Sequence, residues 1–90
     1  MPSIHIPTTM RRFTNNERSV EVPGASVSAA LHALAERYPQ ALGQIYDEGG
    51  KLKSFVAIFV NDTDVRSLAG LDTPVRENDE VHIILAIAGG

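Results

Sequence analysis

The chain ends in the stretch EVHIILAIAGG, residues 80–90, in which every second side chain from Val81 to Ile87 is apolar. This alternation predicts a β-strand from Glu80 to about Ile87, because successive side chains of a strand point to opposite faces of the sheet. One fully apolar parity is typical of a strand in a sheet that is covered on one face. We therefore expect this strand at the centre of a sheet.

Further strands are predicted upstream of this one. Partial alternation predicts a strand over Ser3–Met10 and another over 19–22, which pair as an antiparallel hairpin. An apolar, partly β-branched run predicts a third over 55–60, and a short strand is expected to begin at Val65. The last strand is expected to run parallel to the first.

One main helix is predicted between the second and third strands. Its apolar face recurs at helical spacing and comprises Val27, Ala30, Leu31, Leu34 and Tyr38. Ser26 is a suitable N-cap, and Pro39 ends the helix because it disfavours helical geometry at the preceding residue. A short helical turn is expected within residues 40–54.

This order of elements predicts an α+β fold of the ubiquitin-like β-grasp type, with a mixed sheet of four to five strands and one main helix packed on one face. Ninety residues form a single domain, 1–90, whose last residues 88–90 are expected to be a flexible Ala-Gly-Gly tail. A chain of this length buries one modest core.

Composition excludes several function classes. The chain carries 8 basic and 11 acidic residues, a balance that argues against a nucleic-acid partner. It contains no cysteine, which rules out thiolate metal sites and a cysteine nucleophile. No signal peptide and no apolar run long enough for a membrane span is visible, so a cytoplasmic protein without a membrane partner is expected.

Two stretches resemble a known family. The sequence from Asp79 through an apolar strand to Ala88-Gly89-Gly90 is similar to the end of the MoaD/ThiS-type ubiquitin-like sulfur carriers. The helix segment that begins at Ser26 and ends before Pro39 resembles the helix of that family. The stretch 55–66, followed by Gly70-Leu71, is most similar to the CysO-like carriers, which supply sulfur for cysteine biosynthesis.

The resemblance implies a protein cosubstrate rather than an enzyme, and Gly90 as its working residue. A C-terminal carboxylate has a pKa of about 3.5 and is ionised and unreactive at neutral pH. An activating partner enzyme of the ubiquitin-activating type therefore adenylates Gly90 with ATP and Mg²⁺, and sulfur delivery leaves a thiocarboxylate. Ala88 and Gly89 give a thin tail that threads into a partner's active site, because glycine lacks a Cβ. No cofactor is expected to be bound by the chain itself.

Strand parity also predicts a docking face. The helix is expected to cover the side chains of Ile4, Ile6, Ile58, Val81, Ile83 and Leu85. The opposite face then carries Phe59, His82 and Ile84, joined by His5 and Pro7. Exposed apolar side chains that lie side by side mark a partner site. Arg11 falls where the family often carries an arginine, and we expect a charged contact at the rim, against the alternative of an ordinary solvated arginine.

Other polar residues are assigned no chemistry. His5 and His82 lie on neighbouring strands, but two ligands without a third do not make a metal site, so none is predicted. Asp62 and Asp64, next to Arg66, are expected to be solvated, and Glu80 is grouped with the solvated loop charges around residue 79.

Three classes of function remain open. The first is a sulfur carrier, whose acceptor is a pyridoxal-phosphate-dependent cysteine synthase or, for a MoaD-like small subunit, the large subunit of molybdopterin synthase. The second is a ubiquitin-like modifier conjugated through Gly90. The third is a non-covalent binding module with a dispensable tail. Deleting Gly90 abolishes the first two functions and leaves the third intact.

Overall fold

The computed structural model of the chain describes residues 1–85 and contains one mixed five-stranded sheet. Its strands are β1 (Ser3–His5), β2 (Ser19–Glu21), β3 (Val56–Val60), β4 (Thr63–Asp64) and β5 (Glu80–Leu85). Two α-helices, α1 (Val27–Arg37) and α2 (Pro39–Ile45), and three short 3₁₀ helices, η1 (Thr8–Phe13), η2 (Val65–Ser67) and η3 (Gly70–Asp72), complete the described chain.

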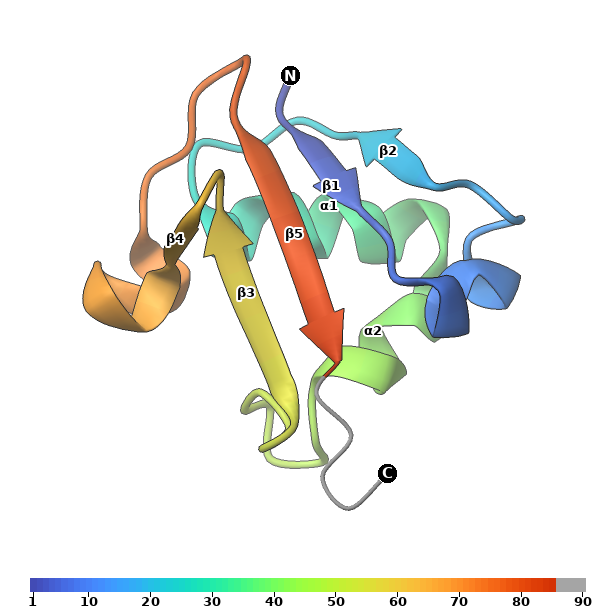
Figure 1. Ribbon diagram of the computed structural model, residues 1–90. Helices are drawn as coiled ribbons and strands as arrows, with labels where there is room; N and C mark the ends of the chain where they lie inside the picture. Colours follow the sequence, from blue (N-terminus) through green and yellow to red (C-terminus); the bar gives the residue numbers. More distant parts are fainter. Residues whose placement is uncertain (86–90) are drawn as a thin grey trace.

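Strand β5 occupies the centre of the sheet, whose order is β2-β1-β5-β3-β4 (Figure 1). It pairs parallel with β1 and antiparallel with β3, while β1 and β2 form the antiparallel hairpin. The predicted β-grasp architecture and the parallel pairing of the first and last strands are therefore confirmed.

Helix α1 lies across one face of the sheet (Figure 1). The Ser26 hydroxyl accepts a hydrogen bond from the backbone N–H of Ala29 at 3.1 Å, which confirms the predicted N-cap. Four of the five predicted apolar side chains of the helix are fully buried, and the fifth, Tyr38, packs against the core. Burial of this face against the sheet provides most of the helix's stability, since isolated helices of this length are marginal in water.

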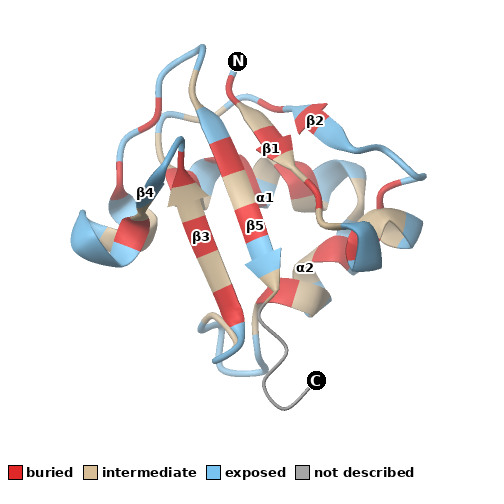
Figure 2. Ribbon diagram, viewed as in Figure 1, coloured by how far each residue is buried: buried red, intermediate tan, exposed pale blue. Residues whose placement is uncertain are grey.

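Pro39 both ends α1 and begins α2. Its ring fixes a φ that suits the first turn of a helix, where no N–H donor is needed. The predicted helical turn after Pro39 is thus a seven-residue helix, and its Ala41 and Ile45 are completely buried. Helix α2 extends the layer that α1 begins and closes the lower part of the core (Figure 2).

Two strand predictions were wrong, one in the length of the strand and one in the type of element. The first strand ends at His5, well before the predicted Met10. The Pro7 carbonyl instead accepts a hydrogen bond from the N–H of Met10, which starts η1 and buries the Met10 side chain. At Val65 the structure has the 3₁₀ helix η2 in place of the predicted strand, because the Asp64 carboxylate caps this helix by accepting a hydrogen bond from the N–H of Arg66. The short strand β4 lies directly before η2.

Within residues 1–85, no helix has the length and apolar character needed to cross a membrane.

Candidate functional site

Strand β5 connects the core to the end of the chain, and its two faces differ sharply. Val81 and Ile83 point into the core and are almost completely buried, and Leu85 packs at its margin. His82 and Ile84 point to the opposite face, which neither α-helix covers (Figure 2). We call this the outer face of the sheet.

The outer face gathers the side chains that parity predicted. Phe59 of β3 lies opposite His82, and Ala57 lies opposite Ile84, whose side chain is therefore flanked by a small neighbour. Ile84 is 44% exposed. Two shallow depressions lie on the two sides of β5 and share His82 and Ile84: one is also lined by Phe59, the other by His5 and Pro7. The predicted location of these residues is confirmed, and their role in docking stays a prediction.

Arg11 makes a contact within the chain, and its predicted contact with a partner stays a prediction. It lies in η1, is half-buried, and its Nε donates a hydrogen bond to the backbone carbonyl of Ile6 at 3.2 Å. It is not among the residues that line either depression. The contact ties η1 to the residue that follows β1, which gives Arg11 a structural role within the chain.

A cluster of three side chains occupies the outer face at the start of β5. His5 and His82 are paired in the parallel register of β1 and β5, and their rings stack with centroids 4.4 Å apart. The Glu80 Oε1 atom lies 3.3 Å from the Nε2 atoms of both histidines. Glu80 is solvent-exposed, as expected, and is the first residue of β5, but its position beside the two histidines was not predicted. The missed signal was parity, because residues 80 and 82 of one strand face the same side.

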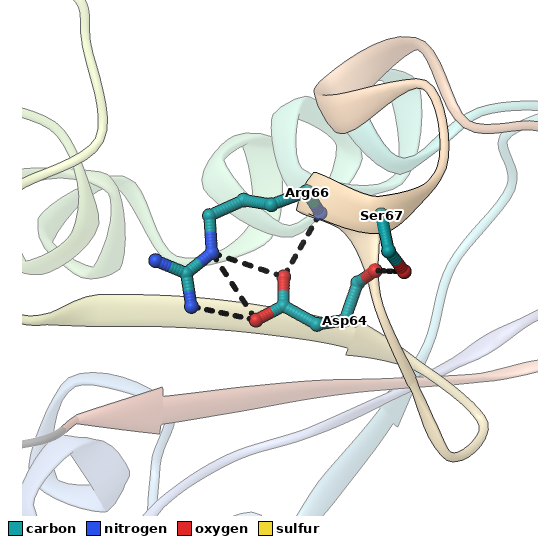
Figure 3. A network of polar contacts seen from close by, with 3 residues as sticks. All are labelled: Asp64, Arg66 and Ser67. Carbon is teal, nitrogen blue, oxygen red and sulfur yellow. Dashed lines mark hydrogen bonds and ion pairs between the residues drawn. The ribbon is translucent and has the colours of Figure 1, made fainter.

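Asp64, Arg66 and Ser67 form a local network of polar contacts (Figure 3). Asp64 accepts hydrogen bonds from the Arg66 guanidinium, the shortest at 2.7 Å, and from the Arg66 N–H. Its backbone carbonyl accepts from the Ser67 hydroxyl. The guanidinium holds the pKa of Asp64 below its ordinary value of 3.8. These contacts cap η2 and give Asp64 a structural role.

Comparison with known proteins assigns the family. The model of the ThiS family matches residues 4–90, nearly the whole chain. The chain belongs to the ThiS family. Among its relatives, the sulfur carrier protein CysO of Mycobacterium tuberculosis is 38% identical over 98% of this chain and 97% of its own. A putative sulfur carrier protein of Archaeoglobus fulgidus is 30% identical over 97% of this chain and 96% of its own.

Several solved structures share the fold of this chain. A chain of the BexX/CysO complex from Amycolatopsis orientalis matches with a TM-score of 0.91 and 36% identity, and each chain is covered completely. Mycobacterium tuberculosis CysO matches with a TM-score of 0.89 and 35% identity, over 97% of this chain and all of that one. Small archaeal modifier protein 1 from Methanosarcina acetivorans, at 23% identity and a TM-score of 0.87, shows the same fold and no more than the fold.

The predicted tail of this ThiS-family chain, Ala88, Gly89 and Gly90, lies outside the residues that the structure describes. The same is true of Ile87, the predicted end of the last strand. The structure describes β5 up to Leu85.

Proposed function

We propose that this chain is a sulfur carrier that works through the carboxylate of Gly90 and serves its partner enzymes as a protein cosubstrate. The observation that carries the proposal is the match of the ThiS family model through residue 90, so that the family resemblance includes the terminal Gly-Gly. Relatives named sulfur carrier proteins are matched over nearly their full length, which supports a whole-protein correspondence.

The proposed reaction activates a carboxylate that is otherwise inert. One Gly90 carboxylate oxygen attacks the α-phosphorus of ATP, which forms an acyl-adenylate and releases pyrophosphate, with Mg²⁺ neutralising the phosphate charge. Hydrosulfide then attacks the acyl carbon, AMP leaves, and Gly90 carries a thiocarboxylate. The carrier supplies the carboxylate and the docking surface, while the activating enzyme supplies ATP and Mg²⁺ binding.

The length of the tail limits where the partner can sit. Five residues, 86–90, follow Leu85, and a chain of that length spans at most roughly 17 Å when fully extended. An active site that acts on Gly90 must therefore lie within about that distance of the end of β5. The body of the carrier must then contact the partner near this end of the sheet.

The outer face is the surface best suited to that contact. Ile84 is the last outward-facing described residue of β5 and is exposed, and it lines one depression together with the half-buried Phe59 and His82. Apolar side chains exposed together on a small domain are typical of a partner site. A relative at 36% identity was crystallised as the BexX/CysO complex, which supports docking of this kind of chain on another protein.

Among acceptors, we favour an enzyme of cysteine biosynthesis, because the relatives at 38% identity are CysO proteins. A pyridoxal-phosphate-dependent synthase would use the thiocarboxylate sulfur as the nucleophile toward its bound substrate. Purified thiocarboxylate carrier mixed with such a synthase and the synthase's activated amino-acid substrate should yield a carrier–cysteine adduct, and the absence of the adduct would remove this acceptor.

The first experiment is intact mass spectrometry after incubation with ATP, Mg²⁺, sulfide and an adenylating enzyme of the host. The expected result is a mass increase equal to the exchange of one oxygen for one sulfur. Deletion of Gly90 should abolish the change. A matched control is Gly43→Ala, because a Cβ at this position of α2 has no atom within 4 Å. No mass change, with the enzyme shown active on another carrier, or full activity after deletion of Gly90, would refute the proposal.

A further inference from the structure

We infer that His5, Glu80 and His82 form a binding site on the outer face for a divalent transition-metal ion of the zinc type. This site is separate from the tail and does not depend on the proposed carrier function. The three residues offer two imidazole nitrogens and one carboxylate oxygen, all within 4.8 Å of one another. Two imidazoles and a carboxylate are a ligand set that zinc takes in proteins, with a further position left for water.

The spacing of the donor atoms fits such an ion. Zinc bonds of about 2.1 Å in a tetrahedron hold neighbouring ligand atoms roughly 3.4 Å apart. The Glu80 Oε1 atom already lies 3.3 Å from Nε2 of His5 and 3.3 Å from Nε2 of His82. The two rings stack with an angle of 19° between their planes, and a modest rotation about the broad χ2 of histidine turns both nitrogens toward a common point.

The backbone beneath the three side chains is fixed by the centre of the sheet. His5 and His82 are direct neighbours in the parallel register of β1 and β5, and Ser3 is the neighbour of Glu80. The Glu80 N–H donates to the side-chain oxygen of Asn61, and its carbonyl accepts from the Asn61 N–H at 2.7 Å. Ligand Cα positions that the ladder already holds reduce the entropy lost when an ion binds.

The three side chains are open to solvent on one side, so an ion can enter directly. The side-chain exposures are 40% for His5, 54% for Glu80 and 32% for His82. The donor set selects among ions: imidazole suits zinc, nickel and copper, whereas magnesium and calcium prefer oxygen ligands. His82 also lines both depressions of the outer face, so the cluster borders the predicted docking surface.

The test is isothermal titration calorimetry, in which Zn²⁺ is titrated into the full, tag-free chain at pH 7.5 and the affinity and stoichiometry are measured. Mg²⁺ is titrated in a separate experiment. One Zn²⁺ per chain is expected to bind, and Mg²⁺ is not expected to bind at the same concentrations. His5→Ala and His82→Ala should each weaken the affinity at least about tenfold, since loss of even an outer-shell partner costs that much. Glu80→Gln should weaken it as well.

A matched control is available in His32→Ala, because His32 is exposed on α1 and lies outside the cluster. This variant should bind as the unmodified chain does. Thermal unfolding provides a second readout: saturating Zn²⁺ should raise Tm by roughly 10 °C for the unmodified chain and not for His82→Ala, because an ion that binds only the folded state stabilises it.

Two outcomes would overturn the site. One is no Zn²⁺ binding up to millimolar concentration, which would leave the cluster as a histidine pair beside an ion-pairing glutamate. The other is binding that is unchanged in His82→Ala and Glu80→Gln, which would place the ion elsewhere on the chain.

Discussion

The two neighbouring isoleucines of β5 should lose very different amounts of stability on the same substitution. Ile83 is 2% exposed and belongs to the core, whereas Ile84 is 44% exposed on the outer face. Replacement of isoleucine by alanine removes three carbon groups, and each is worth about 0.8 kcal/mol when it is buried. At Ile83 the full transfer cost of about 2.4 kcal/mol applies, and a cavity in the packed core raises it to about 3–4 kcal/mol.

At Ile84 the same substitution should cost about 1 kcal/mol, because nearly half of the side chain already contacts water and no closed cavity forms. In a domain of this size, 1 kcal/mol corresponds to roughly 4–8 °C in Tm. Ile83→Ala should therefore lower Tm by roughly 12–30 °C, and Ile84→Ala by less than about 8 °C.

The measurement is unfolding by heat and by urea, followed by far-ultraviolet circular dichroism. The activation assay gives the complementary result: Ile84→Ala should raise the KM of the adenylating enzyme for the carrier while the chain stays folded. Equal losses of stability at the two positions would show that the outer face is covered or that the strand register is inverted, and would refute the assignment of the docking face. Unchanged KM in Ile84→Ala would remove Ile84 from the interface.

Three further predictions concern stability. Gly24→Ala should destabilise the chain by about 2–4 kcal/mol in urea unfolding, because Gly24 has a φ of +152° and a Cβ there would lie 2.7 Å from the backbone of α1; a loss below 1 kcal/mol would contradict this. Tyr46→Phe should leave stability unchanged or raise it by up to about 1 kcal/mol, since the buried Tyr46 hydroxyl has no hydrogen-bond partner among the described residues; a clear loss would reveal one. The Arg66 guanidinium lowers the pKa of Asp64, and a backbone N–H lowers the pKa of Asp79. The two ionised carboxylates therefore stabilise the folded chain fully above the unfolded-state pKa of 3.8, and this contribution is lost as the pH falls through their lower folded-state pKa values. Urea midpoints measured below pH 4 should fall less steeply in the Asp64→Asn, Asp79→Asn double variant, and an identical pH dependence would refute this origin.

Prediction from sequence succeeded where local rules and tertiary structure agree. The alternation at Val81, Ile83 and Leu85 fixed the inward face of β5, because a one-residue shift would expose all of these side chains. The Ser26 cap and the Pro39 boundary of α1 depend only on hydrogen bonding within a few residues.

Prediction failed where a backbone group makes a local hydrogen bond that the pattern of apolar residues does not indicate. The stretch after His5 has the composition of a strand, yet the Pro7 carbonyl is paired with the N–H of Met10 in a 3₁₀ turn. Val65 follows a strand, but the carboxylate before it caps a helical turn. These competing local hydrogen bonds override weak strand preference, which depends on context.

The sequence by itself determined that the chain has a central alternating last strand, one amphipathic helix, an outward-facing apolar pair and the resemblance to the ThiS family, because each of these is a pattern along the chain. Only the tertiary structure decided that Glu80 joins His5 and His82. Residues 75 positions apart meet there because β1 and β5 pair in parallel, and the register of that pairing places the three side chains together. Register is a property of the assembled sheet, so a distance between atoms of two strands cannot be read from either strand alone.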